Sequence, residues 1–313
     1  MGKKVLVTGG AGFIGSHVVD RLVNEDCEVR VLDDLSTGKL ENIQTHLRSG
    51  KVELVKGDIR DASVVTKSLD GVSRVIHMAA LDSVPLSTAN PDLTFDINLL
   101  GTLNLLRSSI EQHVDRFVFV SSCAVFGDPV SLPATEETQT NPISPYAESK
   151  LIGERYCLGF SERQLLHTVV LRFFNVYGPR QSINTCSGVV TSFIDRCRLR
   201  LPLMIYGDGS QKRDFVNVKD VVGAISASTK SKGVEGQVIN IGSGEPTSIN
   251  DLAKTVIELA GGDLEITHVK SRAGDIKNSY SDISKAKKLL DFEPKVTLQE
   301  GLKSLFDEKM ATR

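Results

Sequence analysis

The chain has 313 residues, of which 40% are apolar, so it can form one large domain or a main domain with a smaller lobe. Its 37 Lys and Arg residues nearly balance its 39 Asp and Glu residues, which excludes a basic field for nucleic acid or for a membrane surface. No apolar run approaches the roughly 20 residues of a membrane-spanning helix, and we expect no signal peptide. The five cysteines lack C-x-x-C spacing and the six histidines are scattered, which indicates a reducing cytoplasm and no metal site.

The first half of the chain alternates short β-branched runs with stretches of helical periodicity. The expected helices are Ile14–Asn24, Leu93–Glu111 and Tyr146–Phe160. The expected strands are Lys4–Thr8, Glu28–Leu32, Val52–Lys56, Arg74–His77, Arg116–Val120 and Thr168–Leu171. Strands that alternate with helices predict βαβ units, and right-handed crossovers then give an α/β fold with a doubly wound parallel sheet and helices on both faces.

A glycine-rich loop follows the first expected strand and opens an amphipathic helix. Gly9, Gly12 and Gly15 have G-x-x-G-x-x-G spacing, and Gly10 in place of Gly9 completes G-x-G-x-x-G. Glycines in this context let the backbone approach a pyrophosphate, which lies on the helix N-terminus. The loop therefore predicts a Rossmann dinucleotide-binding domain, which we place over residues 1–178.

Two carboxylates end the second expected strand. Asp33 follows Gly15 at close to the spacing of about 20 residues that separates such glycines from a ribose-binding acid. A carboxylate there accepts hydrogen bonds from both ribose hydroxyls and repels a 2′-phosphate, which predicts NAD rather than NADP as the cofactor. Capping of the next segment by Asp33 and Asp34 is the alternative. Asp58 follows the third strand, where an adenine would lie, and His77 ends the fourth as an expected structural hydrogen-bonding residue.

Residues after Phe173 lose this regularity, because Gly and Pro punctuate shorter elements. Val238–Ile241 is expected as one more strand, and Ser284–Leu290 and Leu298–Phe306 as late helices. We therefore expect a smaller, interleaved C-terminal substrate lobe over residues 179–212 and 249–313, while elements near residues 213–248 return to the main domain.

A Tyr–Lys pair begins the helix expected after the fifth strand. Tyr146 and Lys150 are spaced i, i+4 and so share a helix face. A free tyrosine has a pKa of about 10, and a lysine ammonium one turn away, together with the positive nicotinamide, would favour the phenolate and allow it to act as a base. Ser122 closes the fifth strand, at the edge of the sheet where ligands bind. A hydroxyl donor and a tyrosine base are therefore expected beside the nicotinamide, and an exposed helix pair is the alternative.

Several segments occur in order along the chain: TGGAGFIGSH, DDLSTGK, GDIRD, HMAAL, Ser122, YAESK and RFFNVYGPR. Together they resemble the extended short-chain dehydrogenase/reductases, and within them the UDP-glucose and UDP-N-acetylglucosamine 4-epimerases. The resemblance runs from Lys3 to about Leu302. It implies that NAD is bound by Gly9, Gly12, Phe13, Ile14, Gly15, Asp33, Asp34, Ser36, Thr37, Gly38, Asp58, Ile59, Ala79, Ala80, Asn98, Tyr146, Lys150 and Phe173.

The resemblance also implies a UDP-sugar site in the C-terminal half. Asn175 and Arg213 look like family contacts to the diphosphate, and Tyr206 like a residue of the loop near the uracil. Arg272 and Asp275 look like a second phosphate contact and a ribose contact. Arginine suits phosphate because it offers paired hydrogen bonds and a permanent charge, although surface salt bridges are an alternative role for both arginines. The implied substrate site consists of Ser122, Tyr146, Asn175, Val189, Tyr206, Arg213, Arg272, Asp275 and Ser279.

The residues after Ser122 narrow the implied reaction. The 4,6-dehydratases of the family carry Asp-Glu there, whereas this chain has Cys123-Ala124, which cannot remove the proton at C5. UDP-glucuronate decarboxylases usually carry Glu at the position of Ala124. The resemblance then implies inversion at C4 through a 4-keto sugar with tightly bound NAD, in which Tyr146 takes the 4-OH proton, Ser122 helps to relay it and Lys150 tunes the tyrosine. A 4-reductase or a decarboxylase is the alternative enzyme, and a non-catalytic NAD-binding scaffold is a further alternative.

The resemblance also bears on substrate size and assembly. A bulky tyrosine at the family position of Ser279 crowds a 2-N-acetyl group, so Ser279 implies that UDP-GlcNAc and UDP-GalNAc fit as well as UDP-glucose and UDP-galactose. HMAALDSVP also resembles the N-acetyl-accepting type, although Leu86 replaces an Arg common there. Helices Leu93–Glu111 and Tyr146–Phe160 form the dimer surface in relatives, which implies a homodimer. The apolar stripe of Phe95, Leu99, Leu103 and Leu106 fits this role, and core packing explains it equally well.

Overall fold

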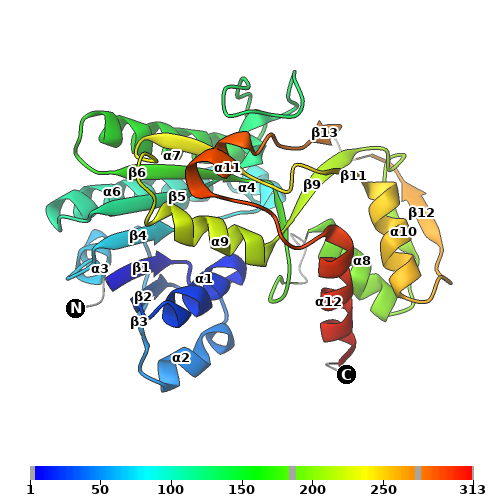
Figure 1. Ribbon diagram of the computed structural model, residues 1–313, viewed down its shortest axis with the longest axis horizontal. Helices are drawn as coiled ribbons and strands as arrows, with labels where there is room; N and C mark the ends of the chain where they lie inside the picture. Colours follow the sequence, from blue (N-terminus) through cyan, green and yellow to red (C-terminus); the bar gives the residue numbers. More distant parts are fainter. Residues whose placement is uncertain (1–3, 183–187, 272–275, 312–313) are drawn as a thin grey trace.

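The computed structural model describes residues 4–182, 188–271 and 276–311, and a parallel sheet forms the centre of its larger part (Figure 1). Within these residues the sheet has seven strands in the order β10-β6-β5-β4-β1-β2-β3. They are β1 (Lys4–Thr8), β2 (Glu28–Asp33), β3 (Val52–Lys56), β4 (Arg74–His77), β5 (Arg116–Ser122), β6 (Thr168–Phe173) and β10 (Gln237–Ile241). All neighbouring strands run parallel, which confirms the expected doubly wound α/β fold.

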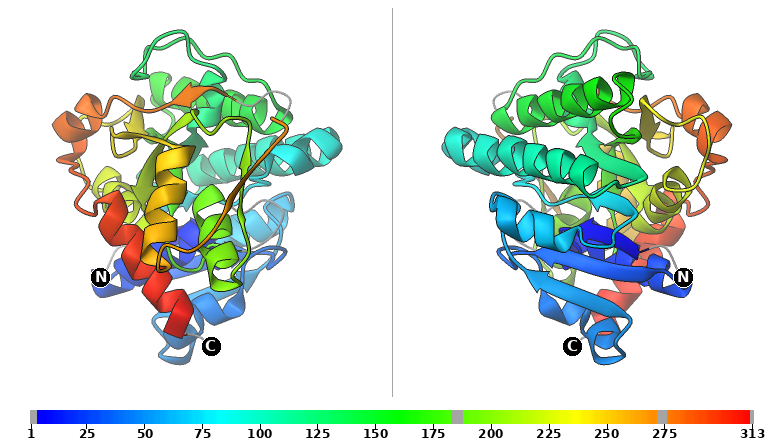
Figure 2. Two further views of the ribbon diagram at one scale, coloured as in Figure 1. Left: turned by 90° about the vertical axis from the view of Figure 1, so that its right-hand side faces the viewer. Right: turned by 90° about the vertical axis from the view of Figure 1, so that its left-hand side faces the viewer.

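Helices cover both faces of this sheet, as the two views of Figure 2 show. One face carries α1 (Phe13–Asn24), α9 (Val218–Ser228) and α11 (Ser284–Leu290), and the other carries α3 (Ala62–Ser68), α6 (Gly101–Glu111) and α7 (Pro145–Glu162). Consecutive strand residues serve opposite cores because side chains alternate across a strand. Val5 and Val7 lie in the first core, and Leu6 lies in the second. Burial on both faces explains why the strands read as continuous apolar runs.

The helix expected over Leu93–Glu111 is interrupted in the structure. The segment consists of α5 (Pro91–Phe95), the π-helical turn η2 (Asp96–Leu100) and α6, and α4 (Val84–Ala89) precedes it. Asn98 lies in the π turn, and its side chain hydrogen-bonds the backbone of Leu81. Single π turns inside α-helices often mark functional sites, and this one brings a buried amide to the loop after β4.

A second lobe, formed by later parts of the chain, lies at the right of Figure 1. One small sheet contains β11 (Pro246–Ser248), β9 (Lys212–Asn217), β13 (Asn278–Ser279) and β7 (Asn175–Tyr177), and another pairs β12 (Ile266–Val269) with β8 (Leu203–Tyr206). Helices α8 (Val189–Arg198), α10 (Ile249–Leu259) and α12 (Leu298–Ala311) pack around a separate apolar core. Short connecting elements are η1 (Leu40–Asn42), α2 (Gln44–Arg48) and η3 (Cys123–Phe126).

The expected late elements are present. Strand β10 pairs with β6 at the edge of the large sheet, and α11 and α12 match the two late helices, with α12 extending to Ala311. Strand β9 joins the small sheet and not the large one. The division of the chain into two domains at residue 178 stays a prediction. In the part of the chain that the structure describes, no helix combines the length and the apolar character needed to cross a membrane.

Candidate active site

The glycine loop turns sharply between β1 and α1. Gly9 has a φ of +70°, and a Cβ on it would lie 2.9 Å from the amide nitrogen of Ala79. A Cβ on Gly15 would lie only 2.1 Å from the carbonyl oxygen of Gly9. Helix α1 begins at Phe13, after Gly12 as N-cap, and no acidic residue lies in its first turn. Unpaired amides of a first helical turn suit an anion, so this cradle fits a pyrophosphate and with it a dinucleotide.

The carboxylates of Asp33 and Asp34 both stabilise the chain around the glycine loop. Asp33 is buried, and its two oxygens each accept a 2.9 Å hydrogen bond, from the amides of Ala11 and Leu35. Burial raises the pKa of Asp33, and the two backbone hydrogen bonds oppose this effect. Asp34 is exposed and accepts from the amide and the hydroxyl of Ser36, at 2.9 and 2.6 Å. Capping therefore accounts for part of the role of each carboxylate, and ribose binding by Asp33 stays a prediction.

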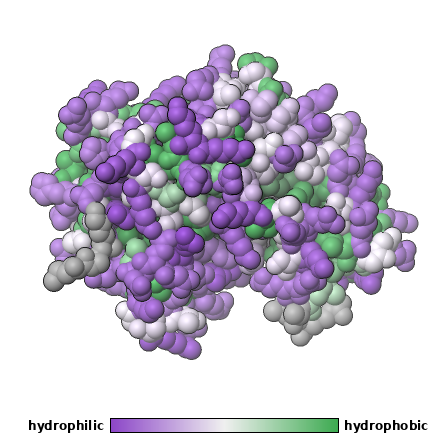
Figure 3. Space-filling view, in the orientation of Figure 1, coloured by the Kyte–Doolittle hydropathy of each residue, from purple (hydrophilic) through white to green (hydrophobic). Residues whose placement is uncertain are grey.

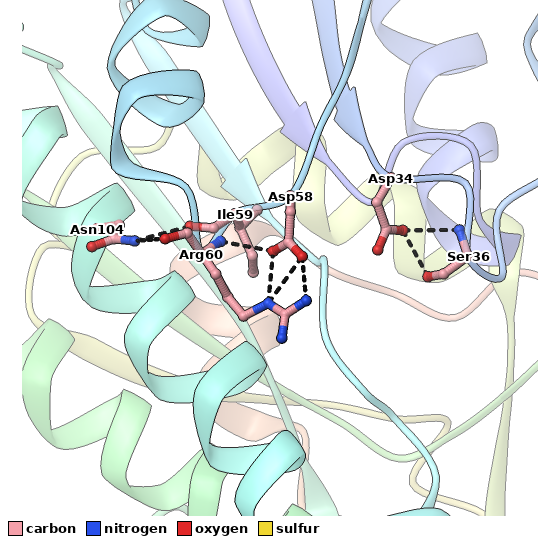
Figure 4. Close-up of polar contacts among 6 residues, drawn as sticks. All are labelled: Asp34, Ser36, Asp58, Ile59, Arg60 and Asn104. Carbon is pink, nitrogen blue, oxygen red and sulfur yellow. Dashed lines mark hydrogen bonds and ion pairs between the residues drawn. The ribbon is translucent and has the colours of Figure 1, made fainter.

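The loop after β3 is fixed by two side chains, as Figure 4 shows. Arg60 donates from Nε and Nη2 to Oδ2 of Asp58, at 2.9 and 2.5 Å, and this guanidinium holds the pKa of Asp58 below its usual range. Asn104 of α6 donates to the carbonyls of Ile59 and Arg60, at 3.1 and 2.9 Å. The sequence reading overlooked Arg60 and Asn104, although Arg60 stands inside the GDIRD segment. Together they hold Asp58 and Ile59 at the strand end where an adenine is expected.

His77 is a buried structural residue, as expected. Its Nδ1 lies 2.8 Å from Oγ1 of Thr8, and its Nε2 lies 2.8 Å from Oγ1 of Thr102. The Thr102 hydroxyl donates to the carbonyl of Asn98, so it accepts from Nε2–H, and the ring is neutral. Burial, aided by the charge of Lys150, lowers the pKa of His77 to about 3. This chain of hydrogen bonds joins the end of β1 to the π turn.

The candidate cofactor residue Asn98 uses its amide within the protein. Its Oδ1 accepts from the amide of Leu81 at 2.8 Å, and its Nδ2 donates to the carbonyl of Leu81 at 3.1 Å and to the hydroxyl of Ser149 at 2.9 Å. Both amide hydrogens are therefore engaged. Asn98 joins the loop after β4 to α7, and its direct contact with a cofactor stays a prediction.

Ser122, Tyr146 and Lys150 come together at the carboxyl end of β5. The Ser122 hydroxyl accepts from the amide of Ala124 at 3.2 Å, which leaves its hydrogen free for its hydrogen bond with Tyr146. Tyr146 lies in the first turn of α7, where its backbone amide donates to the hydroxyl of Ser87 at 3.1 Å. Nζ of Lys150 lies 6.0 Å from the centroid of the Tyr146 ring. The expected convergence is therefore present.

The side chains around Tyr146 do not by themselves favour its phenolate, and the combined effect of Lys150 and a positive nicotinamide stays a prediction. Burial raises the pKa of Tyr146 well above its ordinary value, the Ser122 hydrogen bond opposes this, and the charge of Asp82 adds to it. The Lys150 ammonium instead donates to the carbonyl of Val120 at 2.9 Å, and burial lowers its pKa to about 8. The side chains of the protein thus leave the phenol protonated at neutral pH. The sequence could not show this, because burial is a property of the folded chain.

The candidate sugar site joins the turn after Ser122 to the small sheet. Ser279 of β13 is buried and lies in register with Arg213 of β9. Hydrogen bonds link the Cys123 thiol to Ser279 and to Ser122, while burial raises the pKa of that thiol to about 11. Cys123 thus lies beside both Ser122 and Ser279.

The remaining substrate candidates lie on several elements. Asn175 begins β7, and its Nδ2 donates to the carbonyl of Asp214 at 3.3 Å. Nη1 of Arg213 donates to the carbonyl of Lys212 at 2.9 Å. Val189 begins α8 and Tyr206 ends β8. Arg272 and Asp275 lie outside the described residues.

Asp214 is a buried carboxylate that the sequence reading overlooked. It accepts hydrogen bonds from both the amide and the hydroxyl of Ser243, from the amide of Gly244, and from both the amide and the hydroxyl of Ser281. These donors lie 29 to 67 residues away in sequence, so no local sequence pattern predicts the hydrogen bonds. The carboxylate joins β9 to two loops and thereby supports Arg213, its neighbour in sequence.

A family model described as GDP-mannose 4,6 dehydratase matches residues 6–305 of this chain. The chain belongs to this family. It is an extended short-chain dehydrogenase/reductase, as its glycine loop and Tyr–Lys pair implied. A putative UDP-glucose 4-epimerase of Methanocaldococcus jannaschii is 40% identical over 301 residues, which cover 96% of both chains. UDP-glucuronic acid decarboxylase 1 of Xenopus tropicalis is 34% identical over 96% of this chain and 70% of its own length.

Solved structures of this family share the whole fold. A UDP-glucose 4-epimerase of Thermotoga maritima, solved with UDP-glucose, has a TM-score of 0.94 at 39% identity and covers 99% of both chains. A UDP-N-acetylglucosamine 4-epimerase of Methanobrevibacter ruminantium, in complex with UDP-N-acetylmuramic acid, has a TM-score of 0.95 at 35% identity over 100% of this chain and 99% of its own. A UDP-glucuronic acid 4-epimerase of Bacillus cereus, in complex with a UDP-fluoroglucuronic acid and NAD, has a TM-score of 0.93 at 32% identity over 99% and 100%.

Proposed function

We propose that this family member is an NAD-dependent UDP-sugar 4-epimerase, which interconverts UDP-glucose with UDP-galactose and UDP-GlcNAc with UDP-GalNAc. The observation that carries the proposal is the meeting of Ser122, Tyr146 and Lys150 at the end of β5, on the same carboxyl edge of the parallel sheet as the glycine cradle. The relatives and solved neighbours named as UDP-sugar 4-epimerases support the same reaction. The solved neighbour with NAD supports the cofactor.

The protein's part in the reaction is to hold the sugar and move one proton. When bound, oxidised NAD supplies the hydride acceptor for C4 of the sugar and a positive charge beside the phenol. Tyr146 takes the proton of the 4-hydroxyl and returns it, while the Ser122 hydroxyl turns its hydrogen from Tyr146 to the sugar O4 when the sugar binds. Lys150, whose ammonium donates to the carbonyl of Val120, places a positive charge 6.0 Å from the centroid of the Tyr146 ring. Arg213 and Asn175 hold the diphosphate, so that the sugar can turn in the pocket.

The residues of the turn after Ser122 favour epimerisation over 4,6-dehydration. Cys123 and Ala124 occupy the positions where a dehydratase needs acidic groups. Burial also raises the pKa of the Cys123 thiol to about 11, which leaves it protonated and unfit to remove a carbon-bound proton at neutral pH. A decarboxylase is the second candidate because the Xenopus enzyme is 34% identical to this chain. Release of carbon dioxide from UDP-glucuronic acid distinguishes that activity from epimerisation, and a 4-reductase would consume NADH stoichiometrically.

The proposal is tested by turnover with Tyr146→Phe and Tyr156→Phe, two variants that remove a hydroxyl from the same helix. Tyr146→Phe should lose about 10²–10⁴-fold in kcat, because it lacks the general base, and it should keep bound NAD and affinity for UDP. Tyr156 is 40% exposed, so its variant should keep normal turnover. The measurements are mass spectrometry of bound nucleotide and incubation with UDP-Glc and UDP-GlcNAc. Near-normal turnover by Tyr146→Phe would overturn the proposed function.

A further inference from the structure

A buried ion pair joins α7 to β6 close to the candidate catalytic residues. The carboxylate of Glu154 on α7 accepts hydrogen bonds from Arg172 on β6, from Nε to Oε1 at 2.9 Å and from Nη2 to Oε2 at 2.7 Å. The hydroxyl of Ser121 on β5 donates a third bond to Oε1 at 2.5 Å. The side chains of Glu154 and Arg172 are 2% and 6% exposed. Paired bonds between a guanidinium and a carboxylate fix orientation as well as distance.

Stability alone is a weak reason for this pair. Removing two charges from water costs several kcal/mol for each ion, and well-packed apolar residues are often as stabilising as a buried ion pair. Ser121 adds a bond that charge neutralisation does not require, because Arg172 already pairs both carboxylate oxygens. The arrangement therefore suits a role in holding geometry.

The bonded residues adjoin the catalytic candidates on each element. Ser121 directly precedes Ser122 on β5, and its register partner in the sheet is Arg172 on β6. Glu154 lies about one helical turn after Lys150 on α7. One carboxylate thus joins β5, β6 and α7 at the place where the catalytic side chains meet.

Arg172 also holds the turn that follows Ser122. Its Nη1 donates to the carbonyl of Glu136 at 3.2 Å, and its Cζ lies 4.8 Å from the centroid of the Phe126 ring. Phe126 is buried and ends η3, the turn whose N-cap is the Ser122 hydroxyl bonded to the amide of Ala124. The position of Ser122 is therefore restrained on both sides, by the hydrogen bond of Ser121 before it and by the packing of Arg172 on the turn after it.

We propose that Glu154 is a positioning residue that, through Ser121 and Arg172, fixes Ser122 for its hydrogen bond with Tyr146. The inference rests on the proposed function, since it takes Ser122 and Tyr146 as the groups that act on the sugar 4-hydroxyl. The inference assigns Glu154, a buried residue, an effect on turnover that it exerts through Ser121 and Arg172.

Ser121→Ala tests the proposal without leaving a buried charge unpaired, because Arg172 still neutralises Glu154. The expected result is a kcat lower by about ten- to a hundredfold, with an unchanged KM for the UDP-sugar and with NAD still bound, since small displacements of catalytic groups cost rates of this order. Thermal unfolding should stay close to that of the wild type. A merely structural role would lower the unfolding temperature and leave kcat intact.

Ser109→Ala is the matched control. Ser109 is a fully buried serine of α6, and its hydroxyl has no hydrogen-bond partner in the described part of the chain. Its removal should leave kcat and KM unchanged. Arg172→Lys is the second test variant, because it keeps the charge but loses the paired bonds and the contact with Phe126. It should show the same loss in kcat as Ser121→Ala.

The outcomes separate this inference from the proposed function. Absence of C4 inversion by the wild type contradicts the proposed function itself. Turnover by the wild type together with normal kcat in either Ser121→Ala or Arg172→Lys overturns the positioning role alone. A loss confined to KM, or an equal loss in Ser109→Ala, overturns it as well.

Discussion

At the scale of single residues, we propose that Ser279 controls which sugars the pocket admits. It is buried on β13 beside Arg213, and the Cys123 thiol hydrogen-bonds it. Ser279→Tyr should lower kcat/KM for UDP-GlcNAc by at least about tenfold relative to UDP-Glc, because the ring takes the space of a 2-N-acetyl group. Steady-state turnover of both sugars by the wild type and the variant measures this ratio. An equal loss on both sugars would contradict a size-selecting role for Ser279.

Sequence patterns predicted the site residues that follow local rules. The glycines, Asp33, Ser122 and the Tyr146–Lys150 pair stand where a strand ends or a helix begins, so local patterns were enough to mark them as candidates. The overlooked groups have partners that lie far apart in the chain. Glu154, for example, bonds residues 18 and 33 positions away. The pKa of Tyr146 has a related origin, since burial raises it and burial is absent from a sequence motif.

At the scale of elements, the turn from β1 into α1 depends on Gly15. Gly15→Ala places a Cβ 2.1 Å from the carbonyl of Gly9, so the loop must move. We expect loss of bound NAD and a decrease of about 1–3 kcal/mol in the free energy of unfolding, the usual cost of overpacking. Mass spectrometry of the purified protein and urea unfolding measure the two effects.

Gly223→Ala is the control for this change. Gly223 lies inside α9, where a Cβ would meet no atom within 4 Å. The substitution should stabilise the protein by about 0.5–1 kcal/mol, because alanine has the higher helix propensity. It should not change the NAD content. Retention of NAD by Gly15→Ala at the wild-type level is the result that would refute the role of the glycine loop.

The regular elements of the large sheet could be read from the sequence, whereas the π turn and the small sheets could not. Strands buried on both faces leave clear apolar runs, and β1, β3 and β4 match their expected bounds. The π turn over Asp96–Leu100 leaves no such mark, because its residues also suit an ordinary helix. Strands as short as β7, β11 and β13 owe their conformation to pairing with β9, which is far away in sequence.

At the scale of the whole molecule, the candidate site draws residues from both lobes. The order of the large sheet reverses between β1 and β4, and ligands in such sheets bind at the carboxyl ends of the strands near that point. A single residue separates β6 from β7, and β7 pairs with β9. The carboxyl end of β6 in the large sheet is therefore connected directly to the small sheet. The lobe that carries Arg213 and Ser279 is therefore tied to the sheet that carries Ser122.

One side of the molecule exposes apolar side chains. Val84, Leu86, Leu93, Leu100 and Tyr156 are each between 40% and 46% exposed and belong to α4, α5, η2 and α7, which contact one another. The face seen in Figure 3, over α9 and α12, is in contrast mostly hydrophilic. Exposed apolar side chains on neighbouring elements are a feature of interaction sites. We propose that it is the surface through which two copies form a homodimer.

Leu100→Glu tests this assembly. The wild type should be a dimer at micromolar concentration by size-exclusion chromatography with light scattering, and the variant should dissociate about a hundredfold more readily, since an unpaired charge buried in an interface costs several kcal/mol. Leu199→Glu is the control, because Leu199 is 54% exposed at the end of α8 in the other lobe. A monomeric wild type contradicts the dimer. Equal dissociation of both variants contradicts the assignment of the dimer to this surface, because a charge far from it would then act as strongly as one inside it.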